Sequence, residues 1–188
     1  MPTSEYSMKY LLLQARNPDD LARAEEHKAF ANQLECSTDE IASFDILSQK
    51  LTKELFEQHE VILVGGSGEY SVLDNDKRIK DFIDFLSMCV DYGHPLFASC
   101  FGFQALVVGL GGTVIKDVPH AEVGTYKLNL TEEGKKDPLF ASFPHEFNAQ
   151  LGHQDRASIM PEMTTNLAYS KRCPYQAFTI KNKPVYAT

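Results

Sequence analysis

Short apolar runs recur along this chain and alternate with segments of helical character. Residues 61–64 (VILV) form a continuous, mostly β-branched run, and residues 9–14 and 95–99 are similar segments suited to buried strands. Such runs are typical of strands in a parallel sheet that helices cover on both faces. Residues 21–34 and 79–92, which lie between these predicted strands, carry apolar residues at helical spacing. The alternation predicts an α/β fold of three layers, with a mostly parallel central sheet and helices on both faces.

The pattern changes after Gly109. A second strand at residues 43–47 and a helix at 49–59 still belong to the alternating part. Beyond Gly109 come short strands and turns, which predict antiparallel or mixed strands, at residues 112–115, 125–130, 146–149 and 176–180. No internal repeat or linker divides the chain, so one domain is predicted over residues 1–188.

Charge and composition exclude several classes of function. The chain of 188 residues has 18 Lys and Arg against 26 Asp and Glu, a net charge of −8, which disfavours nucleic acid as a partner.

No apolar run approaches the roughly 20 residues of a membrane-spanning helix, and the first residues lack a secretion signal, so we expect a cytoplasmic protein. Cys36, Cys89, Cys100 and Cys173 form no C-x-x-C pair, and we expect no metal and no cofactor.

A potential nucleophile lies between a predicted strand and a predicted helix. Ala98 and Gly102 flank Cys100 at two positions on either side, where a sharp strand-to-helix turn demands small residues and presents the side chain above the sheet. The unpaired N–H groups of a helix N-terminus favour the thiolate. The alternative is a buried cysteine that packs as a small apolar residue, which we expect for the other three cysteines.

A glycine-rich loop, residues 65–68, directly follows the VILV run. In a parallel sheet its backbone N–H groups lie at the same edge as Cys100. Attack by a thiolate on a carbonyl needs such donors for the developing oxyanion, and we expect the N–H of Phe101 and one from this loop. A flexible turn is the alternative; a phosphate-binding loop is disfavoured because neither of the usual glycine spacings is present.

These segments resemble the class I glutamine amidotransferases with a Cys-His-Glu triad, in particular stand-alone members similar to the amidotransferase domain of GMP synthase. Residues 98–104 match the family's Gly-x-Cys-x-Gly-x-Gln segment, with Ala98 in place of the first glycine. Residues 64–68 resemble the oxyanion strand, with Ser67 where proline is more usual. Residues 122–124 and 152–155 are similar to the family's Glu-hydrophobic-Gly and His-x-Asp segments.

The resemblance implies a flavodoxin-like fold and hydrolysis of the glutamine side-chain amide. Cys100 would form the thioester, the backbone N–H groups of Gly66 and Phe101 would hold the oxyanion, and Gln104, His153 and Gly65 would line the glutamine pocket. The ammonia released would pass to a separate acceptor-binding synthase.

The largest departure from the family lies at residues 183–188 (KPVYAT), which resemble the strand that precedes the family's His-Pro-Glu segment. The sequence is predicted to stop before these triad partners, to fold, and to hydrolyse glutamine poorly. His153 is the generic substitute for the base, although in the family its segment borders the pocket. Two other functions stay open: a different cysteine-elbow hydrolase with a γ-glutamyl or ester substrate, and a catalytically incomplete binding or regulatory module.

Overall fold

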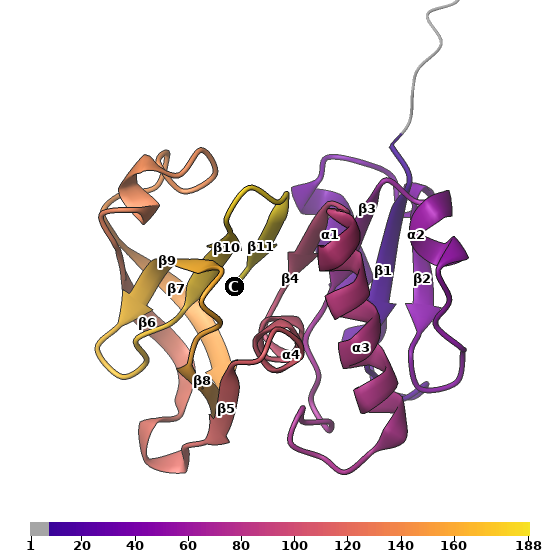
Figure 1. Ribbon diagram of the computed structural model, residues 1–188, viewed down its shortest axis with the longest axis horizontal. Helices are drawn as coiled ribbons and strands as arrows, with labels where there is room; N and C mark the ends of the chain where they lie inside the picture. Colours follow the sequence, from indigo (N-terminus) through magenta and orange to yellow (C-terminus); the bar gives the residue numbers. More distant parts are fainter. Residues whose placement is uncertain (1–7) are drawn as a thin grey trace, which may run out of the picture.

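The computed structural model describes residues 8–188 (Figure 1). In this part of the chain nine strands form one sheet, in the order β2-β1-β3-β4-β11-β10-β9-β6-β7. Five of them are parallel to one another: β1 (Tyr10–Gln14), β2 (Ile41–Asp45), β3 (Val61–Val64), β4 (Leu96–Ala98) and β11 (Val185–Ala187). The parallel sheet predicted from the apolar runs is therefore confirmed, and the carboxyl ends of these strands lie at one edge.

The remaining strands are antiparallel, which confirms the mixed second half. They are β6 (Glu122–Leu130), β7 (Glu146–His153), β9 (Thr164–Ser170) and β10 (Ala177–Ile180), while β5 (Thr113–Lys116) and β8 (Asp155–Ile159) pair separately. Figure 1 shows these pink-orange to yellow strands beside the parallel part, which is indigo to magenta except for the yellow β11. β8 and β9 were not predicted, because their polar sequences become strands through pairing with distant partners.

The helices are α1 (Ala22–Gln33), α2 (Glu54–Gln58), α3 (Lys77–Tyr92) and α4 (Phe101–Gly109), with 3-10 turns at Thr38–Glu40, Val118–His120 and Gly134–Lys136. α2 is shorter than the predicted helix at residues 49–59. The Asp45 carboxylate accepts from the Leu47 N–H, and the Gln49 side chain accepts from the Asp45 N–H, both at 2.9 Å. These bonds form a turn after β2 and delay the helix.

α3 shows how the sequence defines a helix. The Asp76 carboxylate accepts from the Arg78 N–H at 2.8 Å and caps its first turn. Gly93, with a φ of 70°, ends it in the left-handed conformation that glycine adopts without strain. Between these caps the apolar face is buried, through Ile79, Phe82, Ile83, Phe85, Leu86, Cys89 and Val90.

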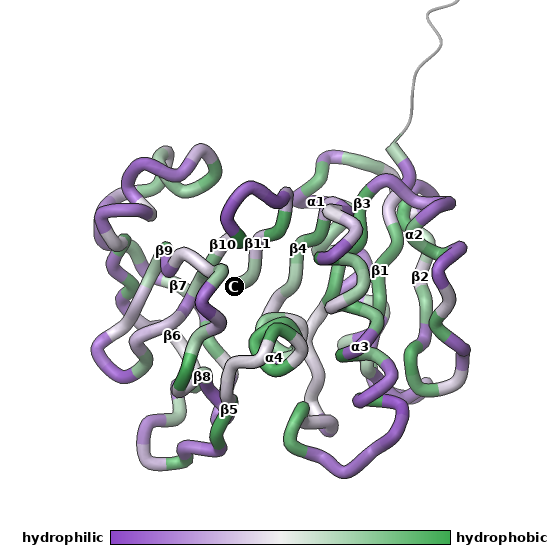
Figure 2. Tube along the Cα trace, in the orientation of Figure 1, coloured by the Kyte–Doolittle hydropathy of each residue, from purple (hydrophilic) through white to green (hydrophobic). Residues whose placement is uncertain are grey.

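Alternate residues of the parallel strands pack against different helices. Leu12 and Leu63 share a buried cluster with Ala31 of α1 on one face. Leu11 and Val64 belong to the larger cluster on the other face, to which α3 and α4 contribute. Figure 2 shows this apolar interior as green along α4 and the central strands. The two clusters confirm the predicted three-layer arrangement.

Candidate active site

Cys100 occupies a strained turn between β4 and α4. Its φ is 51°, a conformation that non-glycine residues rarely adopt and that surrounding structure must enforce. At Gly102 an added Cβ would lie 2.6 Å from Val64 Cγ1 and 3.0 Å from Ala98 Cβ, so a larger residue would collide with β3 and β4. The predicted need for a small residue after the nucleophile therefore has a direct steric cause.

Backbone hydrogen bonds hold the turn on both sides. The Ser99 N–H donates to the Val64 carbonyl at 2.9 Å, and the Cys100 N–H donates to the Thr188 carbonyl at 2.6 Å. Thr188 in turn donates to the Ala98 carbonyl at 2.9 Å. Cys100 is thus positioned between the carboxyl ends of β3 and β11, and Thr188, beside the mark C in Figure 1, lies next to it.

The electrostatic surroundings of the thiol act in opposite directions. Burial raises the pKa of Cys100 above its ordinary value and is the largest influence. The Phe101 N–H and the Arg16 guanidinium lower this pKa, while the Glu26 and Asp155 carboxylates raise it further. The helix N-terminus acts in the predicted direction, but burial outweighs it. The thiol form is therefore favoured at neutral pH.

The glycine loop lies beside Cys100, as expected for neighbouring parallel strands. A Cβ added to Gly66 would be 3.7 Å from Cys100 Cβ and 3.5 Å from Arg16 Nη2. The Gly66 N–H does not point into open space: it donates to Glu26 Oε1 at 2.8 Å. At Gly65 a Cβ would overlap the Glu26 carboxylate, so that this approach requires glycine.

Glu26, Arg16 and Gln14 form a polar cluster that sequence reasoning missed. Arg16 Nη2 lies 3.0 Å from Glu26 Oε1, and Gln14 Nε2 donates to Glu26 Oε2 at 2.9 Å. Gln14 is fully buried at the end of an otherwise apolar strand. A polar residue in that position was the one available signal, because buried polar groups require partners.

Gln104 lies one helical turn beyond Cys100 on α4. Its side chain is buried, and Nε2 donates to the Asp155 carbonyl at 3.0 Å. The Asp155 carboxylate accepts from the Ser71 hydroxyl, which connects this position to the segment after the glycine loop. The structure therefore brings Gln104 to the same edge of the sheet as Cys100 and bonds it to the start of β8.

His153, at the end of β7, faces a buried carboxylate. Its Nε2 lies 3.2 Å from Oε2 of Glu122, a residue with no exposed surface. Glu122 also accepts from the Ser170 hydroxyl at 2.7 Å and from the Gln176 side-chain amide. The His153 Nε2 atom lies close to this carboxylate without hydrogen-bond geometry, and sequence reasoning missed Glu122 as the neighbour of the imidazole.

A groove of about 980 Å³ connects these groups. Five of the six predicted site residues line it, namely Gly65, Gly66, Cys100, Gln104 and His153. Apolar side chains that include Phe97, Leu128, Phe140 and Phe147 also line it. Phe101 contributes its N–H beside the sulfur rather than its buried ring. The arrangement presents a thiol, backbone donors and polar side chains to a molecule in the groove.

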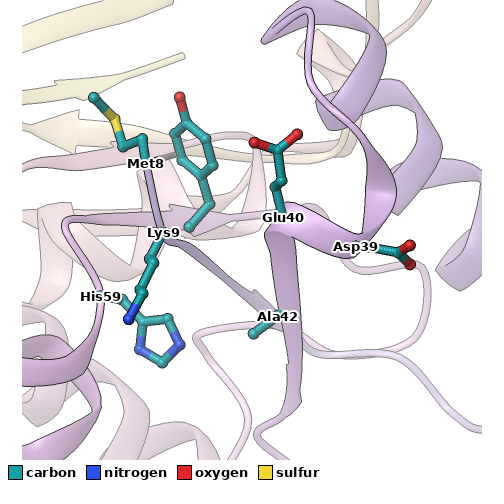
Figure 3. Close-up of a pocket in the computed structure, with 7 residues that line it drawn as sticks. Met8, Lys9, Asp39, Glu40, Ala42 and His59 are labelled. Atoms are coloured by element: carbon teal, nitrogen blue, oxygen red, sulfur yellow. The ribbon is translucent and has the colours of Figure 1, made fainter. Parts of the chain in front are cut away.

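A second, smaller cavity lies at the other end of the strands (Figure 3). Its volume is about 360 Å³, and its lining includes Lys9, Asp39, Glu40 and His59. Among the described residues that line it there is no cysteine or serine. The His59 ring bonds the Leu55 carbonyl at 2.6 Å. The groove beside Cys100 is the stronger candidate for chemistry.

The family model for class-I glutamine amidotransferases matches residues 27–188. The chain belongs to the class-I glutamine amidotransferase family. In this family member, no group of three or more metal-binding side chains is found within residues 8–188. The same part of the chain contains no helix with the length and apolar character needed to span a bilayer.

Relatives of this amidotransferase-family chain include two archaeal proteins, each described as one subunit of a glutamine-hydrolysing GMP synthase. The protein from Methanocaldococcus jannaschii is 35% identical over 92 residues, which are 49% of this chain and 47% of that protein. The protein from Picrophilus torridus is 32% identical over 130 residues, 67% of this chain and 62% of that protein. The matched part of the chain thus spans about half to three fifths of these relatives.

Two solved structures share the fold of this family member. A glutamine amidotransferase from Thermotoga maritima has a TM-score of 0.77 at 19% identity, covering 97% of this chain and 74% of that one. A glutamine amidotransferase from Methylobacillus flagellatus has a TM-score of 0.73 at 17% identity, covering 96% and 68%. Both confirm the predicted flavodoxin-like architecture of class I amidotransferases.

Proposed function

We propose that this protein hydrolyses the side-chain amide of glutamine through a thioester on Cys100. The observation that carries the proposal is the strained turn at Cys100, with a φ of 51° and with the Phe101 N–H beside the sulfur. A thiol on such a turn, at the N-terminus of a helix and next to a glycine loop, is built for attack on a carbonyl. Membership of the amidotransferase family supports glutamine as the substrate.

The reaction proceeds in two halves. The sulfur of Cys100 adds to the amide carbon, and the N–H groups of Gly66 and Phe101 stabilise the oxyanion. The carbon–nitrogen bond then breaks, and the thiol proton leaves on nitrogen as part of ammonia. Water adds to the γ-glutamyl thioester and releases glutamate, and the proton returns to the sulfur.

The groove supports the binding of a substrate beside Cys100. Gln104 and His153 line it together with Cys100, and Gly65 lies where the loop meets it. We assign these three residues, Gln104, His153 and Gly65, to the glutamine pocket. The His153 Nε2 atom lies 3.2 Å from the buried Glu122 carboxylate, which supports a pocket-lining role rather than that of the base.

Proton transfer is assigned to no residue of the chain. Residues 1–188 contain no His-Pro-Glu sequence, and the carboxyl end of β11, after which the family resemblance places it, adjoins Cys100 through the Thr188 carbonyl. We therefore expect a polypeptide of residues 1–188 to release ammonia slowly. Ammonia release at the rate of a complete family member would contradict this expectation.

A separate protein is proposed as the acceptor of ammonia. The relatives from M. jannaschii and P. torridus are each described as one subunit of a GMP synthase, which supports a second, synthase component. We propose that this chain acts in the same way, in the cytoplasm. Ammonia release that stays unchanged when a candidate synthase is added would argue against the partnership.

The test combines labelling with an assay of ammonia release. A glutamine-analogue diazo ketone or chloroketone is expected to label Cys100, and Cys100→Ala is expected to abolish both labelling and activity. Cys36→Ala is the matched control, since Cys36 is a partly exposed free cysteine and lies outside the groove. Labelling that persists in Cys100→Ala would refute Cys100 as the nucleophile.

A further inference from the structure

The Glu26 carboxylate accepts a hydrogen bond from the Gly66 N–H, a donor that the proposed reaction needs for the oxyanion. Its Oε1 accepts from the Gly66 N–H at 2.8 Å, and it lines the groove beside Cys100. The inference rests on the proposed function, in which this same N–H stabilises the oxyanion. One donor cannot serve a resident carboxylate and a substrate oxygen equally well at the same time.

The carboxylate also has an electrostatic effect opposed to catalysis. An oxyanion site acts by offering preorganised donors to developing negative charge in a place without water. A carboxylate bonded to one of these donors adds like charge there, and like charges close together disfavour ionisation. With Glu26 on Gly66, both the thiolate and the oxyanion are less favourable.

Glu26 has partners that do not depend on Gly66. Arg16 Nη2 contacts the same Oε1 at 3.0 Å, and Gln14 Nε2 donates to Oε2 at 2.9 Å. Arg16 is itself anchored by Asp20, with Nη1 2.9 Å from the carboxylate. A small rotation of the Glu26 side chain can thus free the Gly66 N–H while the charge stays paired.

Gly65 allows the Glu26 carboxylate to reach the Gly66 N–H. A Cβ at this residue would overlap the Glu26 carboxylate, so the side chain reaches Gly66 across a glycine backbone. We propose that Glu26 is a gate on the oxyanion site: it closes the site by binding the Gly66 N–H, and glutamine binds productively when Glu26 withdraws onto Arg16 and Gln14. Glu26 acts through Gly66 and Cys100, and is a positioning residue.

The first test measures the thiol without any substrate. The groups that influence Cys100 are Arg16 after β1, Glu26 on α1, Asp155 on β8 and the Phe101 N–H on α4. Glu26→Ala removes one of the two negative charges. We expect the midpoint of the rate–pH profile for alkylation by iodoacetamide to move to lower pH.

The expected gain in rate is moderate. The rise in thiolate is partly offset because a less basic thiolate is a weaker nucleophile, which leaves about a threefold faster alkylation at pH 7. Glu25→Ala is the matched control, since it removes the same charge from an exposed position on the same helix. Peptide mass spectrometry assigns the modification to Cys100.

The second test separates two effects of Glu26: the hydrogen bond that it accepts from the Gly66 N–H, and its negative charge. Glu26→Gln keeps an oxygen that accepts from the Gly66 N–H but removes the charge. We expect its alkylation profile to shift as in Glu26→Ala, and its ammonia release from glutamine to rise less. The same pair of variants also guards against misfolding, because Glu26→Gln preserves the shape of the side chain.

The outcomes distinguish the gate from the proposed function. Alkylation profiles that match wild type in both variants would overturn the gate, as would a shift to higher pH. If wild type releases ammonia, Glu26→Ala releases less, and the alkylation profile is unchanged, the proposed function is supported and the gate is overturned. A shifted profile with no labelling of Cys100 by the glutamine-analogue chloroketone in any variant would support the gate and refute the proposed function.

Discussion

The helical half of the molecule (β1–β4, β11 and α1–α4) and the strand half (β5–β10) differ in what fills their interior. In the helical half a large apolar cluster includes Phe101, next to Cys100, and the rings of Phe101 and Phe82 stack with their centroids 5.5 Å apart. Four residues of the strand half also contribute to this cluster: Val114, Ala157, Phe178 and Ile180. The separate apolar cluster of the strand half is smaller, and this half also holds a fully buried carboxylate, Glu122. The nucleophile thus rests on apolar packing, whereas the strand half combines an apolar groove lining with the buried polar contacts of Glu122.

The largest expected effect tests whether stability resides in the helical half. Phe82→Ala removes a fully buried ring and is expected to lower the free energy of unfolding by about 3–5 kcal/mol. Phe143→Ala in the strand half is the matched control, because that ring is 44% exposed, and it is expected to cost about 1 kcal/mol or less. Urea denaturation measures both values. Equal losses would contradict the contrast between the halves.

The next effect concerns the turn itself. Gly102→Ala places a methyl group 2.6 Å from Val64 Cγ1 and is expected to cost about 2–3 kcal/mol and to slow alkylation of Cys100. Gly68→Ala is the control, since nothing lies within 4 Å of its added Cβ. Urea denaturation and the alkylation rate are measured for each. If the two variants behave alike, close packing does not hold the elbow.

The turn at Cys100 and the position of Glu26 show what the sequence could predict and what it could not. The spacing of Ala98, Cys100 and Gly102 is local, so the strand, the turn and the helix after it could be predicted together. Glu26 could not, because its contact with Gly66 joins residues 40 positions apart and depends on where α1 packs. The pKa of the thiol was equally out of reach, since burial is a property of the assembled fold.

The strand half was predicted less completely for a related reason. β9 runs through Thr164, Thr165 and Asn166, residues without a clear alternation, and its strand conformation comes from pairing with β10 and β6. Parallel strands covered on both faces leave a continuous apolar signal, whereas these strands take their stability from distant partners. The amino-acid pattern therefore identifies the half that holds the nucleophile better than the half that completes the groove.

A third prediction examines the polar interior of the strand half. Glu122→Gln replaces one carboxylate oxygen by an NH₂ group, which cannot accept, so either the Ser170 hydroxyl or the Gln176 amide loses its acceptor. We expect a loss of about 1–2 kcal/mol in the free energy of unfolding, the usual cost of an unsatisfied buried group. Glu146→Gln, at an exposed position on β7, is the control and is expected to be neutral. A neutral Glu122→Gln would mean that the carboxylate is not needed for stability.

The smallest expected effect is a pH dependence that separates two buried cysteines. Burial among the apolar residues of α3 raises the pKa of Cys89 to about 12 from an ordinary value of 9.0. Above pH 9 the unfolded thiol ionises while the folded one stays protonated, so stability is fully present below pH 9 and is lost as the pH rises toward 12. At pH 10 this loss amounts to about 1.4 kcal/mol.

Comparison with Cys173 of the strand half completes the test. Burial also raises the pKa of Cys173, but a backbone hydrogen bond from Tyr175 and the charge of Arg156 act to lower it. We therefore expect Cys89→Ala to flatten the decline in unfolding free energy between pH 8 and pH 10 more than Cys173→Ala does, as followed by urea denaturation. An equal effect of the two substitutions would show that the apolar surroundings in the helical half protect a buried thiol no better than the polar surroundings in the strand half.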